Sequence, residues 1–224
     1  MKRRTAVLGL FASLLLAAGS SMTGCATTGV ERATKTTNTM QTVESEYRQV
    51  GLQVDATNAS LQELVSPNQT DIKKAFEKYQ TNVTRMEKLG KKLDKDSADM
   101  RAQGQKYFAE WENQDTGYTN PQIRQLSDER RLELREVFAQ IPEASVGVKG
   151  ALHAYIANVG EIRNYLSNDL TPKGVDAITP VARKAVQDGE DLKASVQPVL
   201  AAIDRARSAM AQGGASRATG DQTP

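Results

Sequence analysis

Cysteine and histidine, the side chains that most readily supply a nucleophile, a general base or a transition-metal ligand, occur only once each in the 224-residue sequence, as Cys25 and His153. One cysteine cannot form an intramolecular disulfide, and a zinc site needs several converging ligands, a spacing that the sequence lacks. A Cys–His pair would need a fixed base and a defined pocket, whereas Cys25 lies beside a polar segment. We therefore expect no enzymatic activity, no metal and no cofactor, and a packed or solvated His153.

Residues 1–24 have the three parts of an export signal. The basic start MKRR precedes the apolar run TAVLGLFASLLLAAG, and small and polar residues follow. The apolar core of about 14 residues is short for a bilayer span, which needs about 20. A buried core helix is the alternative, but the basic start and the polar run that follows argue against it. We expect this segment to be a signal peptide that is removed.

The signal ends at Met22-Thr23-Gly24-Cys25, which resembles the lipobox of bacterial lipoproteins. In that motif a hydrophobic residue and two small residues precede the cysteine, and Met22 stands here in place of the usual Leu. The resemblance implies cleavage between Gly24 and Cys25, a diacylglyceryl group on the Cys25 thiol and acylation of the new amino group. The alternative is an ordinary signal peptide with a chance cysteine, which would leave the thiol free for an intermolecular disulfide.

Lipid on Cys25 would make a membrane the first partner of the chain. Each buried methylene contributes about 0.8 kcal/mol and one fatty chain binds only marginally, so two or three chains would make attachment effectively permanent. In the sorting rule of enteric bacteria an Asp after the cysteine implies retention in the inner membrane, and here Ala26 follows. The resemblance therefore favours the outer membrane, with the chain facing the periplasm and residues 25–29 as the lipidated cysteine and its tether.

The charge balance excludes a basic surface of the kind that gathers nucleic acid. The formal net charge is +2, but three of the 29 basic residues, Lys2, Arg3 and Arg4, lie in the export signal. Without them, 26 basic side chains face 27 acidic ones. We expect no nucleic-acid partner.

An unbroken heptad pattern indicates that residues 30–65 form one long helix, because its larger side chains alternate three and four positions apart and therefore share one seam. The seam residues are Met40, Val43, Tyr47, Val50, Val54, Thr57, Leu61 and Leu64. Ser66 and Pro67 are expected to end this helix, and Ser66 with Gln69 fits a capping box for the next one.

A second seam with the same spacing runs from Ile72 to Trp111. Three of its positions, seven residues apart, hold the small residues Gly90, Ser97 and Gly104. Glycine inside a helix costs about 1 kcal/mol relative to alanine, so something should offset it. The simpler interpretation is close approach of a neighbouring helix, or room for its aromatic rings. The alternative is a groove that admits a ligand, for example an acyl chain.

A third helical region should begin with Asn120 as its N-cap and Pro121 in its first turn. Pro142 should kink this region or divide it in two. Its seam comprises Ile123, Leu126, Leu134, Val137, Ile141, Val148, Leu152, Tyr155, Val159, Ile162 and Leu166.

The last region contains two Thr-Pro pairs, which predict a short helical turn from Pro172 and a helix that restarts near Pro180. Pro198 predicts a bend in that helix. Residues 213–224, GGASRATGDQTP, contain no apolar residue larger than alanine and should form a disordered tail. These regions together predict an all-α fold: an elongated antiparallel helical bundle or coiled coil of about four long helices, in a single domain over residues 30–212.

One patch resembles a family of exported bacterial lipoproteins known only as domain of unknown function 2959. The family has a Phe–Glu-Trp stretch, then Tyr-x-Asn, then Arg and Ser, at spacings that match Phe108-Ala109-Glu110-Trp111, Tyr118-Thr119-Asn120, Ile123-Arg124 and Ser127. Its Asn-Leu-Asn run is matched less well, by Asn168-Asp169-Leu170-Thr171. The resemblance would cover residues 30–210 and implies a helical, coiled-coil-rich envelope protein without an assigned activity.

The same patch predicts a helix hairpin in which Asn120 caps the second helix, Tyr118 folds back and Glu110 pairs with Arg124. An exposed pair of this kind contributes at most about 1 kcal/mol. A structural corner is the simpler interpretation. The alternative is an interaction tip made of Trp111, Tyr118, Asn120 and Arg124, because Trp, Tyr and Arg often anchor interfaces.

These features predict a lipid-anchored helical rod in the bacterial cell envelope, with a structural or protein-interaction role and an envelope protein as its partner. The alternative is a ligand- or lipid-binding bundle, a sensor or a carrier, that uses the small residues of the second seam. An enzyme is disfavoured because the carboxylates lie mostly off the seams, where solvated charge is expected.

Overall fold

The computed structural model describes residues 28–115 and 117–215, and five helices account for most of them. The helices are α1 (Gly29–Leu64), α2 (Ile72–Asp115), α3 (Pro121–Ser145), α4 (Val148–Asn168) and α5 (Pro172–Ala215). The described ranges contain no β-strand. The predicted export signal, Gly24 and Cys25, and residues 216–224 of the predicted tail lie outside the described residues.

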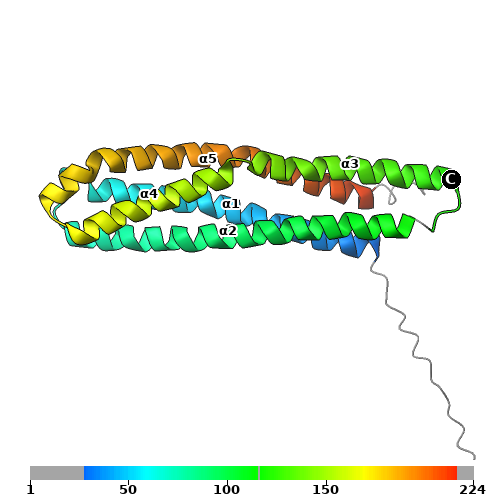
Figure 1. Ribbon diagram of the computed structural model, residues 1–224, viewed down its shortest axis with the longest axis horizontal. Coiled ribbons are helices and arrows are strands. Elements are labelled where there is room, and N and C mark those ends of the chain that lie inside the picture. Colours follow the sequence, from blue (N-terminus) through cyan, green and yellow to red (C-terminus); the bar gives the residue numbers. More distant parts are fainter. Residues whose placement is uncertain (1–27, 116, 216–224) are drawn as a thin grey trace, which may run out of the picture.

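The helices form one elongated antiparallel bundle that is arranged like a four-helix bundle (Figure 1). α1 packs against α2 and α5, while α3 and α4 each pack against α2 and α5. α3 and α4 lie end to end and together take the place of a fourth long helix, diagonally across from α1 (Figure 1). The predicted all-α fold, an elongated helical bundle with long antiparallel regions, is confirmed.

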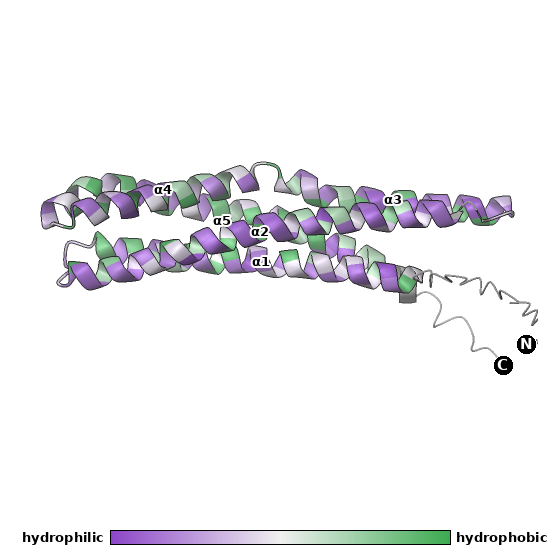
Figure 2. Cartoon of the chain, turned by 60° about the horizontal axis from the view of Figure 1, so that its bottom comes forward, coloured by the Kyte–Doolittle hydropathy of each residue, from purple (hydrophilic) through white to green (hydrophobic). Residues whose placement is uncertain are grey.

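The heptad pattern identifies the buried face of α1 correctly. All eight seam residues from Met40 to Leu64 are buried. Along each helix, hydrophobic residues recur between hydrophilic ones, as an amphipathic helix requires (Figure 2). α1 begins with a capping box: Thr28 Oγ1 accepts from the Glu31 amide at 3.2 Å, and a Glu31 carboxylate oxygen accepts from the Thr28 amide at 2.7 Å.

The third region is divided in two, as Pro142 predicts, but the break falls four residues after the proline. α3 continues through Pro142 to Ser145, whose hydroxyl donates to the Ile141 carbonyl at 2.8 Å. Gly147 then adopts a φ of +88°, a conformation that only glycine enters at little cost. α4 starts directly after this turn.

The predicted restart near Pro180 is wrong, because α5 is continuous from Pro172 to Ala215 across both Pro180 and Pro198. An internal proline removes one helical hydrogen bond and kinks the helix. Packing outweighs that cost here: Ala182 and Val199, close to the two prolines, are fully buried. Tertiary context of this kind overrides local propensity.

The third seam is only partly buried. Ile123 and Leu126 in the first turns of α3 are exposed, by 47% and 66%, against the prediction that they join the core. Arg130 donates to the Ala209 carbonyl of α5 at 2.6 Å, so the start of α3 lies level with the last turns of α5 or beyond them.

Candidate functional site

The small-residue positions of α2 have two different surroundings. A Cβ atom added at Gly104 would lie 2.1 Å from Cζ of Phe138, and one at Gly90 would lie 2.5 Å from Cδ1 of Ile156. Both glycines therefore make room for side chains of the neighbouring helix, as the simpler interpretation predicts. Sequence analysis missed Phe138, although Leu134, Phe138 and Ile141 are spaced four and three apart, as a seam requires.

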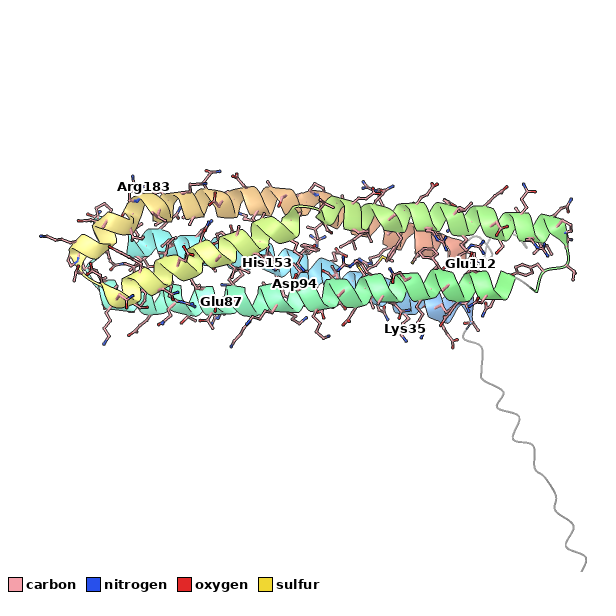
Figure 3. The ribbon with its side chains drawn as sticks, viewed as in Figure 1. Lys35, Glu87, Asp94, Glu112, His153 and Arg183 are labelled. Carbon is pink, nitrogen blue, oxygen red and sulfur yellow. The ribbon has the colours of Figure 1, made fainter. Side chains whose placement is uncertain are left out.

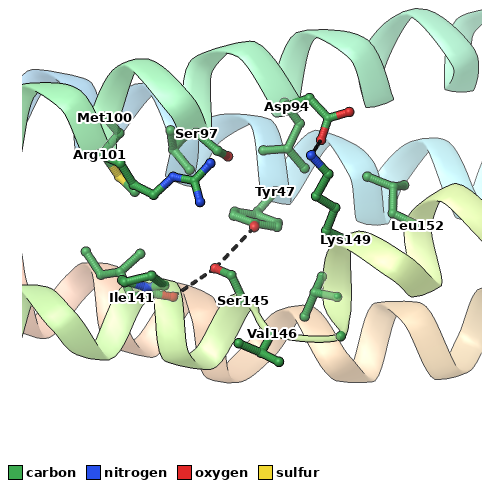
Figure 4. A pocket seen from close by; sticks show the side chains of 15 residues that line it. Tyr47, Asp94, Ser97, Met100, Arg101, Ile141, Ser145, Val146, Lys149 and Leu152 are labelled. Carbon is green, nitrogen blue, oxygen red and sulfur yellow. Dashed lines mark hydrogen bonds and ion pairs between the residues drawn. The ribbon is translucent and has the colours of Figure 1, made fainter.

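Ser97, the third small residue, instead lines a pocket of about 250 Å³ at the junction of α3 and α4 (Figure 4). We call it the junction pocket. Ser97 lies between the two glycines in the α2 sequence and faces the turn at which α3 ends and α4 begins. The main apolar side chains that line the pocket are Val43, Leu93, Met100, Ile141, Val148 and Leu152.

Two polar side chains that line the junction pocket, Tyr47 and Ser145, are hydrogen-bonded to each other. The Tyr47 hydroxyl donates to Ser145 Oγ at 3.5 Å, and Ser145 in turn donates to the Ile141 carbonyl at 2.8 Å (Figure 4). Arg101 lies at the rim, where its side chain is exposed and has no ion pair among the described residues. The pocket therefore combines an apolar lining with one unpaired cation at its edge.

An ion cluster borders the other side of the pocket. A carboxylate oxygen of Asp94 on α2 lies 3.0 Å from Lys149 Nζ (Figure 4), and the other lies 2.8 Å from His153 Nε2 (Figure 3); both partners are on α4. Burial raises the pKa of Asp94, but the hydrogen bonds from Lys149 and His153 outweigh it and hold the pKa below its usual value. His153, the single histidine, is thus a half-exposed partner of a surface carboxylate.

The predicted interaction tip is a hairpin corner that an aromatic cluster holds together. Trp111 donates from Nε1 to Ser127 Oγ at 2.9 Å, which ties the end of α2 to α3, and its ring meets Tyr107 edge to face at 5.8 Å. Phe108 likewise meets Phe138 at 5.9 Å. These contacts fix the direction in which α3 leaves the corner.

Asn120 and Arg124 act on the connection itself. Asn120 caps α3 as predicted, because its Oδ1 accepts from the Gln122 amide at 2.9 Å. Arg124 donates from Nη2 to the Tyr118 carbonyl at 2.7 Å. The predicted pair between Glu110 and Arg124 does not form, since Glu110 lies instead beside Arg32 and Lys106, at 4.0 and 3.7 Å.

Two fully buried tyrosines lie in the far half of the bundle, and their surroundings make them structural. Tyr79 donates to the Val159 carbonyl at 2.6 Å, and Tyr155 donates to Asn58 Oδ1 at 2.8 Å. Burial raises the pKa of both hydroxyls far above the usual value. Both stay neutral at any physiological pH, and they act as hydrogen-bond donors that fix helix register.

Residues 28–115 and 117–215 contain no group of three His, Cys, Asp or Glu side chains that could hold a metal ion. Among the described helices, none is long and apolar enough to span a bilayer. Comparison with known proteins finds no matching family, no matching curated protein and no matching solved structure.

Proposed function

We propose that the chain is a bacterial lipoprotein, held on a membrane of the cell envelope by lipid on Cys25, with its helical bundle facing the periplasm in a structural or protein-interaction role. The observation that carries the proposal is the lipobox-like Met22-Thr23-Gly24-Cys25 at the end of an export signal. The folded part begins at the Thr28 cap, three residues later. Outer-membrane placement and membership of the family known as domain of unknown function 2959 are parts of the same proposal.

The bundle suits a spacer or an adaptor more than a catalyst. Helices of 36 and 44 residues are about 54 and 66 Å long at 1.5 Å per residue, so the rod would carry a contact site well away from the membrane. Its long helix faces offer surface to an envelope protein. In-cell cross-linking of the wild-type chain, followed by purification, would identify that partner.

The lipid anchor is tested by mass spectrometry of the protein purified from membranes. Because Cys25 is the single cysteine, thioether-linked lipid on the wild-type chain can only be there. Cys25→Ala should give unprocessed or mislocalised protein, and Thr27→Ala, which leaves the lipobox intact, should behave as wild type. Wild-type protein without lipid would refute the proposal.

A second candidate function, binding of a small amphipathic ligand, is favoured by the junction pocket. Its apolar lining with Arg101 at the rim suits a molecule with a hydrocarbon part and an anionic group. Organic extraction of protein purified from cells and freed of its own anchor should then release such a molecule. Ser97→Leu, which fills the pocket, should abolish it, whereas Ser45→Leu on the exposed face of α1 should not.

A further inference from the structure

Several large apolar side chains are exposed at one end of the bundle, where α1 begins and α2 meets α3 (Figure 1). Ile123 and Leu126 on α3 are 47% and 66% exposed, Tyr118 in the connection is 38% exposed, and Val30 in the first turn of α1 is 71% exposed. At the opposite end, the apolar residues of the two connections, Val65 and Leu170, are half-buried against the core. Four of the nine exposed large apolar residues among the described ones thus lie where the chain enters the bundle, against two, Tyr165 and Val181, toward the opposite end.

This end lies close to the proposed anchor. Arg32 in the first turn of α1 donates to the Gln114 side chain in the last turn of α2 at 2.8 Å, so the start of α1 and the end of α2 are level. From Cys25 to the Thr28 cap the chain advances three residues, which span at most about 10 Å when fully extended. A lipid on Cys25 therefore brings the membrane surface within reach of the α2–α3 connection.

We propose that residues 117–126, the membrane-facing tip, lie in the headgroup region of the membrane that holds the lipid on Cys25. This inference rests on the proposed lipid anchor. With the tip on the membrane, the rod has two membrane contacts, and these fix its orientation. With the lipid alone, it would pivot about a single contact.

The chemistry of the tip fits a lipid interface. Ile123 and Leu126 would bury apolar surface at the acyl boundary, as the apolar faces of interfacial helices do. Tyr118 has the amphipathic ring that favours an apolar body and a wet hydroxyl. Arg124 uses Nη2 for the Tyr118 carbonyl, which leaves other guanidinium N–H groups for lipid phosphates.

So few apolar side chains would bind a membrane weakly by themselves. The anchor changes this, because a tether of three residues makes the second contact intramolecular and keeps the local concentration of lipid high. The tip therefore needs only modest affinity to stay on the surface.

The test uses a chain whose single tryptophan is in the tip. Trp111 is the only tryptophan, so Trp111→Phe with Tyr118→Trp moves the fluorophore. The Phe ring can still pack against Tyr107, but the hydrogen bond to Ser127 is lost, so circular dichroism and thermal unfolding of this variant are first compared with the wild type. The lipidated protein is reconstituted into vesicles of phosphatidylethanolamine and phosphatidylglycerol whose acyl chains are brominated near the headgroup, and lipid on Cys25 is verified by mass spectrometry. We expect bromine to quench most of the emission.

Matched variants separate the tip from general surface apolarity. Ile123→Ser with Leu126→Ser should remove most of the quenching, whereas Leu52→Ser, at a residue that is 70% exposed on α1, should leave it unchanged. Circular dichroism should show the same helix content in all variants, because these side chains lie outside the core.

Each outcome is decisive. Lipidated protein that floats with vesicles but is not quenched overturns the tip proposal and leaves the anchor standing, and it is the result expected if a second copy or another protein covers the tip. Equal quenching in all variants also overturns it, since the apolar residues would then not matter. Protein without lipid on Cys25 refutes both proposals.

Discussion

The seam shared by α3 and α4 is buried along α4 and uncovered at the start of α3. The α4 seam residues are at most 4% exposed (Val148, Leu152, Tyr155, Val159, Ile162 and Leu166), whereas Leu126 of α3 is 66% exposed. Apolar residues recur every three or four positions all along α4, whereas Arg130 interrupts the series in α3 between Leu126 and Leu134. α4 packs against both α2 and α5, whereas Arg130, the tenth residue of α3, is already level with Ala209 near the end of α5. Spacing thus determines which face of a helix is apolar, and the neighbouring helices determine whether that face is covered.

Truncation of one leucine in each part should give the largest contrast. Leu166→Ala removes a fully buried side chain and should lower the free energy of unfolding by about 2–5 kcal/mol, through lost burial and a residual cavity. Leu126→Ala should change it by no more than about 0.5 kcal/mol, as surface substitutions usually do. Chemical denaturation followed by circular dichroism measures both.

Equal losses for the two leucines would contradict the comparison, because they would mean that the start of α3 is covered in solution. The measurement is made on a chain that begins at Ala26, so that neither residues 1–25 nor a membrane can cover Leu126.

Most of the fold was predictable because the heptad pattern is long and unbroken in α1 and α2. The all-α class, the helix hairpins and the Asn120 cap follow from residues close in sequence. The uncovered Ile123 and Leu126 were not recognised, because their exposure depends on which residue of α5 lies beside each turn of α3, and the spacing of apolar residues does not determine that. The continuity of α5 through Pro180 depends on packing against residues distant in the sequence. Helix rules based on neighbouring residues alone do not take such packing into account.

Glycines at two helix positions extend the comparison from whole regions to single sites. Gly104→Ala should cost about 1–3 kcal/mol, since the new methyl group would overlap the Phe138 ring and force it to shift. Gly51→Ala in α1 should instead stabilise by about 0.5–1 kcal/mol, because the added carbon would meet no neighbouring side chain or helix within 4 Å and alanine is the better helix former.

Thermal or denaturant unfolding of both variants checks this prediction, and a stabilised Gly104→Ala protein would show that the Phe138 ring does not pack against Gly104.

Sequence periodicity located the three small residues of α2 but left open whether they mark packing or a pocket. The answer differs among them, because it depends on what α3 and α4 place opposite. Ile156 and Phe138 fill the space beside two of the residues, and the turn at Gly147 leaves space beside Ser97.

The smallest expected effect lies at the α3–α4 junction, within the buried part of the shared seam. The folded-state pKa of Asp94 is below its usual value, because hydrogen bonds from Lys149 and His153 outweigh the effect of burial. The stabilisation is therefore fully present above about pH 4, near the unfolded pKa, and is lost as the pH falls through the folded pKa. The Asp94 side chain is 33% exposed, so solvent screening limits the contribution to at most about 1 kcal/mol. Unfolding free energies measured between pH 7 and pH 2.5 should fall less steeply below pH 4 in Asp94→Asn than in the wild type, and parallel curves would show that this carboxylate does not hold α4 to α2.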